Sequence, residues 1–281
     1  MQIDVIDVRY ESPLSAIPNA KGPSALMERG LLERVGTSGA VRHVEIAARP
    51  RTGSIADHFE LLTEVASAVR QSREEGHFPI VLSGSCLVGL GTLCGIAAGS
   101  RGVAWFDCHG DFNTPDTTMS GLLDGMTTAI MTGRCWKGLS QTVPGFEPLR
   151  DEALLLVATR DLDPDEALML SRSSVVLAPA DAVNRDGGQS QLESLHSRAS
   201  SIYIHVDLDV LDPSVGMANR FAKPGGLTSE ALTRLMVDSV RRGGVEALGF
   251  ASYDPDADTS GRVAEAAIDS IVAVARQLRS R

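Results

Sequence analysis

Short apolar runs alternate along this chain with segments of helical periodicity. The runs occupy residues 3–8, 80–82, 103–107, 153–159, 174–178, 202–208 and 246–251. Apolar residues recur every three or four positions in the helices expected at 55–70, at 228–241 after an N-cap at Thr228, and near 260–279. Strands that are apolar on both faces are typical of a mostly parallel sheet covered by helices. Because no Gly-, Ser- or Pro-rich linker divides the chain, the pattern predicts one α/β domain over residues 1–281.

Composition and charge narrow the classes of partner. Hydrophobic residues make up 43% of the 281 residues, and the formal net charge is −10, which argues against a nucleic-acid partner. The amino-terminal sequence lacks the pattern of a signal peptide, and no stretch is long and apolar enough to span a membrane. The four cysteines form no CxxC pair. We therefore expect a cytoplasmic protein with reduced thiols, no membrane partner and a small-molecule substrate.

The first candidate site follows the run at 103–107. Asp107, His109 and Asp111 alternate along an extended segment, so their side chains are expected on one face. Ligands bind beyond the carboxyl ends of strands in such folds, and two carboxylates with one imidazole there can form half of a metal site. Taken alone, this motif fits three polar residues that cap a loop equally well.

The second candidate site ends the run at 202–208. By the same alternation His205, Asp207 and Asp209 share a face, and unpaired buried carboxylates are unfavourable without a cation. Asp212, just before a proline, is more typical of a turn. Together the two clusters can hold two divalent ions, and oxygen-rich ligation with one histidine suits Mn²⁺. A hydroxide bridging two Mn ions could then attack a planar carbon.

With these motifs in order, the sequence resembles the ureohydrolase family of arginase, agmatinase and formimidoylglutamase. The matching segments are Asp107–Gly121 (DCHGDFNTPDTTMSG), Arg160–Glu166 (RDLDPDE) and Asp207–Pro213 (DLDVLDP). The resemblance implies a three-layer α/β/α fold and hydrolysis of a non-peptide C–N bond in a small linear guanidino- or amidine-like substrate. It also implies two Mn²⁺ ions per subunit, with one ion or another divalent metal as the alternative, and a homo-oligomer, a trimer or hexamer by analogy.

The resemblance also assigns roles by position. Asp107, Asp111 and Asp207 would hold one ion, and Asp107, His109, Asp207 and Asp209 the other. Asn113, Ser120 and Asp163 fall where the family contacts the amino-acid end of its substrate.

Three departures set this chain apart from the family. Cys86 stands where the first histidine ligand is expected, and it is either a thiolate ligand or a small buried apolar side chain. Asp124 replaces the histidine that shuttles protons in the family. Asp124 and His205 are therefore the candidate catalytic acids, and His205 could instead support the metal ligands. Ser252 replaces the glutamate that pairs with a guanidinium, which disfavours arginine or agmatine as the substrate.

The departures leave two further functions open. A degenerate family member would act as a binding or regulatory protein without hydrolysis, and it would hold less than stoichiometric metal. A cysteine-nucleophile amidase acting through Cys86 would tolerate chelators but would be sensitive to thiol alkylation.

Overall fold

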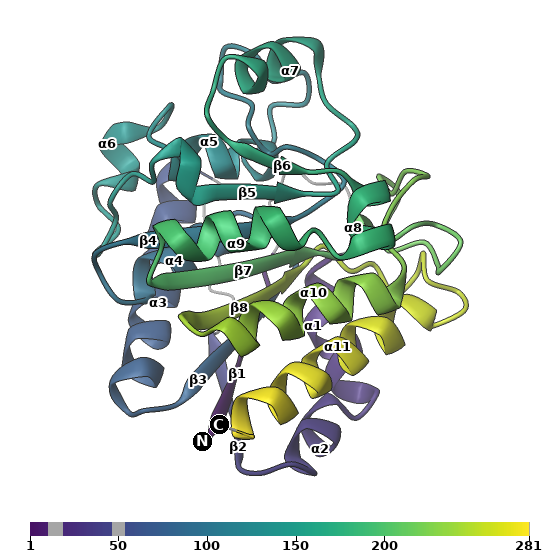
Figure 1. Ribbon diagram of the computed structural model, residues 1–281. Coiled ribbons are helices and arrows are strands. Elements are labelled where there is room, and N and C mark those ends of the chain that lie inside the picture. The colour runs from purple at the N-terminus through teal and green to yellow at the C-terminus, as the bar shows by residue number, and fades with distance from the viewer. Residues whose placement is uncertain (11–18, 47–53, 281) are drawn as a thin grey trace.

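The central sheet has eight strands that pair in parallel in the order β2-β1-β3-β8-β7-β4-β5-β6 (Figure 1). The computed structural model describes residues 1–10, 19–46 and 54–280. Within these residues the strands are β1 Ile3–Val8, β2 Val41–Ile46, β3 Phe78–Ser83, β4 Arg101–Phe106, β5 Leu154–Val157, β6 Val176–Ala178, β7 Ser201–Asp207 and β8 Val245–Ala251.

Helices cover both faces of this sheet and complete three layers. One core packs α1 (Gly22–Glu28), α2 (Leu31–Gly36), α8 (Ala180–Asp186), α9 (Gln189–Arg198), α10 (Ser229–Arg242) and α11 (Arg262–Arg279) against it. Figure 1 shows α9, α10 and α11 in front of the strands. The second core, on the opposite face, packs α3 (Ile55–Glu74), α4 (Val88–Gly95) and α5 (Thr127–Met131). The remaining helices are α6 (Lys137–Ser140) and α7 (Pro164–Ser171).

The predicted fold class is confirmed, and each predicted run coincides with a strand to within a few residues. These strands are mostly apolar in sequence, which suits their buried positions. Every residue of β1, β3, β4, β5 and β7 is buried. The sequence pattern missed β2, whose residues are all half-exposed or exposed except Ile46. As an edge strand it carries polar side chains that hide the apolar run.

Local signals fix the ends of the predicted helices. Thr228 caps α10 as predicted, since its side chain accepts a hydrogen bond from the Ala231 N–H at 3.1 Å. The helix α3 begins with a capping box at Ser54 and ends before Gly76, whose φ of 75° suits glycine. None of the described helices is long and apolar enough to cross a membrane.

The four strands β3, β8, β7 and β4 lie next to one another at the centre of the sheet. Because they run parallel, their carboxyl ends meet at one edge, where ligands bind in this class of fold. The segments that follow them contain Cys86, Ser252, Asp209 and Asp107 respectively.

Candidate metal centre

Asp107 lies at the centre of the site and is fixed by three contacts. It follows β4 and is 1% exposed. The indole Nε1–H of Trp105 donates to its Oδ2 at 3.1 Å, and the backbone N–H of His109 donates to its Oδ1 at 2.7 Å. The imidazole Nδ1 of His109 lies 3.2 Å from the same oxygen. These contacts orient both oxygens of Asp107 before any ion binds.

Asp207 and Asp209 approach Asp107 from the end of β7. The chain leaves the strand in a single 3₁₀ turn, Leu208–Val210, and the carboxylate of Asp207 accepts a hydrogen bond from the Asp209 N–H at 2.8 Å. The Cys108 N–H donates to Asp209 at 3.2 Å, which joins the segments after β4 and β7. The two carboxylates therefore converge through a turn rather than through continued strand alternation.

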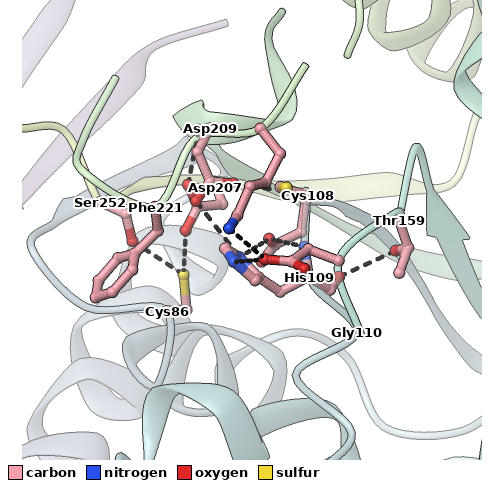
Figure 2. Close-up of polar contacts among 12 residues, drawn as sticks. Cys86, Cys108, His109, Gly110, Thr159, Asp207, Asp209, Phe221 and Ser252 are labelled. Carbon is pink, nitrogen blue, oxygen red and sulfur yellow. Dashed lines mark hydrogen bonds and ion pairs between the residues drawn. The ribbon is translucent and has the colours of Figure 1, made fainter. Parts of the chain in front are cut away.

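Asp111 and Cys86 complete the buried group. Asp111 has a φ of 49°, in the left-handed region, and its buried Oδ2 has no hydrogen-bond partner among the described residues. The Sγ of Cys86 donates to Asp207 Oδ2 at 3.0 Å and lies 3.2 Å from the hydroxyl of Ser252 (Figure 2). Cys86 lies just before α4 and is buried.

The spacing of these side chains suits cations. Potential ligand atoms lie within 4.8 Å of one another in three groups: Cys86 with Asp107 and Asp111, Asp107 with Asp207 and Asp209, and Cys108 with His109 and Asp209. Asp107 belongs to two of these groups. No Arg or Lys is among the described residues that line the cavity above them. No arginine or lysine that lines this cavity neutralises the carboxylates, and the residues present fit a pair of divalent ions.

The pKa values record the same excess of negative charge. Burial, and then repulsion by neighbouring carboxylates, raises the pKa of Asp207 and Asp111 and brings the pKa of Asp209 to about 6. Burial lowers the pKa of His109, but the hydrogen bond to Asp107 and the neighbouring carboxylates outweigh it and raise that pKa to about 10. Without an ion, a proton on His109 serves as the cation of this cluster.

The two predicted proton carriers lie in different surroundings. Asp124 lines the cavity, accepts a hydrogen bond from the Ser85 hydroxyl, and has its pKa raised by burial. His205 is 1% exposed and is not among the lining residues. Its ring stacks on Trp105 at 3.6 Å, its Nδ1 lies 2.8 Å from the Tyr203 hydroxyl, and burial lowers its pKa to about 3. His205 is thus a neutral side chain packed behind Trp105, away from the position expected of an acid in the cavity.

The residues predicted to bind substrate all line the same cavity, whose volume is about 280 Å³. The Asn113 amide donates to Asp163 at 3.1 Å, while Ser120 lies on the exposed rim and accepts from the Leu122 N–H at 3.2 Å. Ser252 lies deeper, beside Cys86. The structure therefore brings together every predicted site residue except His205.

Three further residues hold this cavity in shape and were not assigned roles from the sequence. Glu166 accepts hydrogen bonds from the N–H groups of Phe112 at 2.8 Å and Asp163 at 3.1 Å. Asn219 donates to the Ser252 carbonyl at 2.9 Å and accepts from the Phe221 N–H at 2.8 Å. Phe221 lines the cavity with its ring edge-on to His109, at 6.3 Å. Glu166 belongs to the quoted RDLDPDE segment; Asn219 and Phe221 lie in a loop with no pattern that marks them.

Residues 212–226 form the loop that covers this edge. The carboxylate of Asp212 accepts hydrogen bonds from the N–H groups of Ser214, Gly225 and Gly226, at 2.7–3.1 Å. It thus joins the two ends of the loop, in agreement with the structural role expected for a turn residue. Lys223 pairs with Asp161 at 3.2 Å at the half-exposed rim. The Asp212 contacts close the loop on itself, whereas the Lys223 ion pair ties it to the segment that follows β5.

Comparison with known proteins gives consistent results. The model of the arginase family matches residues 18–275. The arginase of Bacillus caldovelox is 28% identical over 266 residues, 88% of this chain and 89% of that protein. The arginase of Brucella melitensis is 30% identical over 216 residues, 73% of this chain and 70% of that protein. The crystal structure of Bacillus cereus arginase superposes with a TM-score of 0.89 at 25% identity and covers 98% of both chains.

Proposed function

Because the chain belongs to the arginase family, we propose that it is a metal-dependent hydrolase of a non-peptide C–N bond in a small linear amidine- or guanidino-like substrate. One observation carries this proposal. Four buried aspartates, His109 and Cys86 converge from the ends of three strands on one cavity that no described Arg or Lys lines. Such a group is unfavourable in a folded protein unless cations offset it.

The donor atoms favour two Mn²⁺ ions. Cys86, Asp107, Asp111 and Asp207 would hold one ion, and Asp107, His109, Asp207 and Asp209 the other. Bound there, such ions would supply Lewis acidity and an activated water. Trp105 contributes by fixing Asp107 through its indole N–H. Asp124 is the proposed proton carrier, because it lines the cavity and burial raises its pKa, which favours the protonated carboxyl.

The far side of the cavity suits the non-reacting end of the substrate. Asn113, Asp163 and Ser120 offer amide, carboxylate and hydroxyl groups there. At the reacting end Ser252 is neutral, so a guanidinium would lack a bidentate carboxylate partner at this position. We therefore propose a substrate whose reacting group does not depend on that ion pair.

A cysteine nucleophile is less consistent with the surroundings of Cys86. Its polar partners are Asp207 and Ser252 and not a histidine base. Burial and the neighbouring carboxylates raise the pKa of the thiol well above its ordinary value. Without a cation it stays protonated and unreactive.

The test combines metal analysis with a substrate panel. Protein stripped with a chelator and reloaded with Mn²⁺ should hold two ions per chain by elemental analysis. It should then release product from at least one guanidino, formimino or amide compound. Asp107→Ala and Asp207→Ala should lose metal and turnover together, whereas the exposed Asp181→Ala on α8 should keep both. Activity that survives complete chelation would refute the proposal, and sub-stoichiometric metal without turnover would favour the degenerate, non-hydrolytic alternative.

A further inference from the structure

Two residues that depart from the family pattern touch each other in the structure. Cys86 follows β3 and Ser252 follows β8, 166 positions later, yet the Cys86 Sγ and the Ser252 Oγ lie 3.2 Å apart (Figure 2). Both side chains are buried, 2% and 8% exposed. We propose that Ser252 is a positioning residue for Cys86, and that its hydroxyl holds the sulfur in place as a metal ligand. This inference rests on the proposed function, since it assumes that a metal ion binds.

Counting donors gives the direction of this hydrogen bond. The thiol has one proton, which it donates to Asp207 Oδ2 at 3.0 Å. The hydroxyl of Ser252 must then donate to the sulfur, which has lone pairs free to accept. Cys86 would hold a bound ion through a sulfur lone pair, with its thiol proton released to solvent. The Ser252 hydroxyl remains as a neutral donor to the thiolate, and a charge-assisted hydrogen bond of this kind strengthens when the acceptor is ionised.

The backbone of Ser252 is held in an unusual conformation that serves this contact. Its φ is 61°, in the left-handed region that a non-glycine residue rarely adopts. The Asn219 amide donates to the Ser252 carbonyl at 2.9 Å and ties the residue to the loop over the cavity. Strained backbone at a site persists where the surroundings enforce it, often for a functional reason. Here it accompanies a hydroxyl directed at a candidate metal ligand.

A negative charge on the Cys86 thiolate explains why a neutral residue suits position 252. A glutamate at position 252 would set a second anion beside a thiolate that already neighbours Asp207. Like charges at such distances repel strongly in a buried site. Serine avoids this repulsion and supplies a donor instead. Cys86 and Ser252 therefore act as one unit: the thiolate is favoured because its neighbour is a hydroxyl.

Cobalt(II) gives a readout specific to the sulfur. In the wild-type protein loaded with Co²⁺, a Cys86 ligand should produce a thiolate-to-cobalt charge-transfer band in the near ultraviolet. Ser252→Ala and Ser252→Gly should move this band to lower energy, because the lone pair is no longer stabilised by a hydrogen bond, and should weaken Co²⁺ binding about tenfold. Ser252→Gly also relieves the left-handed strain, so a purely structural role would leave the band in place and the stability equal or higher. The matched control is Ser120→Ala, which removes another cavity hydroxyl that does not contact Cys86 and should leave the band unchanged.

The possible results separate this inference from the proposed function. An unshifted band with unchanged affinity in both Ser252 variants would overturn the pairing and leave the metal site intact. A wild-type cobalt protein without a thiolate band would overturn it too, because Cys86 would not be a ligand. Failure of the wild-type protein to bind Co²⁺, Mn²⁺ or Zn²⁺ at all would overturn both proposals.

A double-mutant cycle tests the coupling independently. Metal affinity should fall at least tenfold on Ser252→Glu when residue 86 is cysteine, and by much less in the Cys86→His background, where no thiolate faces the new carboxylate. Equal losses in both backgrounds would overturn the claim that the two residues form one unit.

Discussion

Replacing Asp209 by asparagine is expected to stabilise the metal-free protein at pH 8 and to abolish its stabilisation by Mn²⁺. Asp209 is 1% exposed, and burial followed by repulsion from Asp107 raises its pKa from 3.8 to about 6. An asparagine keeps a side-chain oxygen for the Cys108 N–H, which now donates to Asp209 at 3.2 Å. The substitution therefore removes the charge and one acceptor oxygen, Oδ2, which lies 3.4 Å from both the Asn219 amide nitrogen and the His109 Nδ1.

The magnitude follows from the displacement of the pKa. A shift of one pKa unit corresponds to about 1.36 kcal/mol. The shift from 3.8 to about 6 therefore means that ionising Asp209 costs about 3 kcal/mol more in the folded metal-free protein than in the unfolded chain. Because the folded pKa is raised, this cost is absent below about pH 3.8, grows as the pH rises and is complete above about pH 6. Removing the charge of Asp209 also removes an attraction that helps to keep the proton on His109, so we expect a gain of about 1–3 kcal/mol at pH 8.

Urea unfolding after chelation measures this gain. The advantage of Asp209→Asn over the wild-type protein should be largest at pH 8 and should shrink toward pH 4.5. With Mn²⁺ the order should reverse, because the wild-type protein gains free energy from binding and the variant loses a ligand.

Asp4→Asn is the matched control, and its expected effect on the free energy of unfolding has the opposite sign. Asp4 is equally buried, but Arg42 binds both of its oxygens, at 3.1 and 2.6 Å, and His77 lies at 3.2 Å. Burial alone would raise the pKa of Asp4, and these partners lower it. This variant should lose about 2 kcal/mol at pH 8 with or without metal. If Asp209→Asn also destabilised the chelated protein at pH 8, the idea of an uncompensated carboxylate cluster would be wrong.

Three smaller substitutions test how the site and the fold are supported. Trp105→Phe keeps an aromatic ring, although a smaller one, but loses the N–H that donates to Asp107, so Mn²⁺ affinity measured by calorimetry should fall about tenfold without unfolding. Asp212→Ala removes an acceptor for three N–H groups and should lower the thermal midpoint by a few degrees at pH 7. Because hydrogen bonds lower the pKa of Asp212 to about 2, this difference should persist at pH 4 and vanish as the pH falls through 2. Thr228→Ala should cost about 1 kcal/mol of stability in urea unfolding and Thr228→Ser almost nothing, because serine keeps the cap of α10.

The strands that could be predicted are those whose sequences are continuous apolar runs. Buried strands such as β4 and β7 are continuous apolar runs, and a motif that interrupts such a run at its carboxyl end marks a site. β2 escaped prediction because its residues are partly exposed, so its sequence reads as polar. The positions of Asp107 and Asp207 could therefore be predicted, while the edge strand β2 could not; β6, at the other edge, could be predicted because its sequence is apolar.

His205 shows the limit of the period-two argument. Alternation correctly placed it on the same face of β7 as Asp207, but it says nothing of depth. His205 lies two residues before Asp207, which is about 7 Å along the strand. This distance places His205 outside the cavity and under α4. There its ring is within 3.1 Å of where a Cβ on Gly89 would lie. A residue can thus share a face with a metal ligand and still be core.

The contact between Cys86 and Ser252 lies beyond any argument from local sequence. Each residue in isolation looks like the loss of a family function: a missing histidine ligand in one case and a missing guanidinium partner in the other. Only the parallel order β3-β8-β7 brings them within 3.2 Å, where a thiolate next to a hydroxyl is chemically complementary and a thiolate next to a glutamate is not. Two independent losses would predict a site that binds metal poorly and recognises nothing. Two changes that compensate each other predict a site that still binds metal, with a softer ligand, and that has changed the reacting group it accepts.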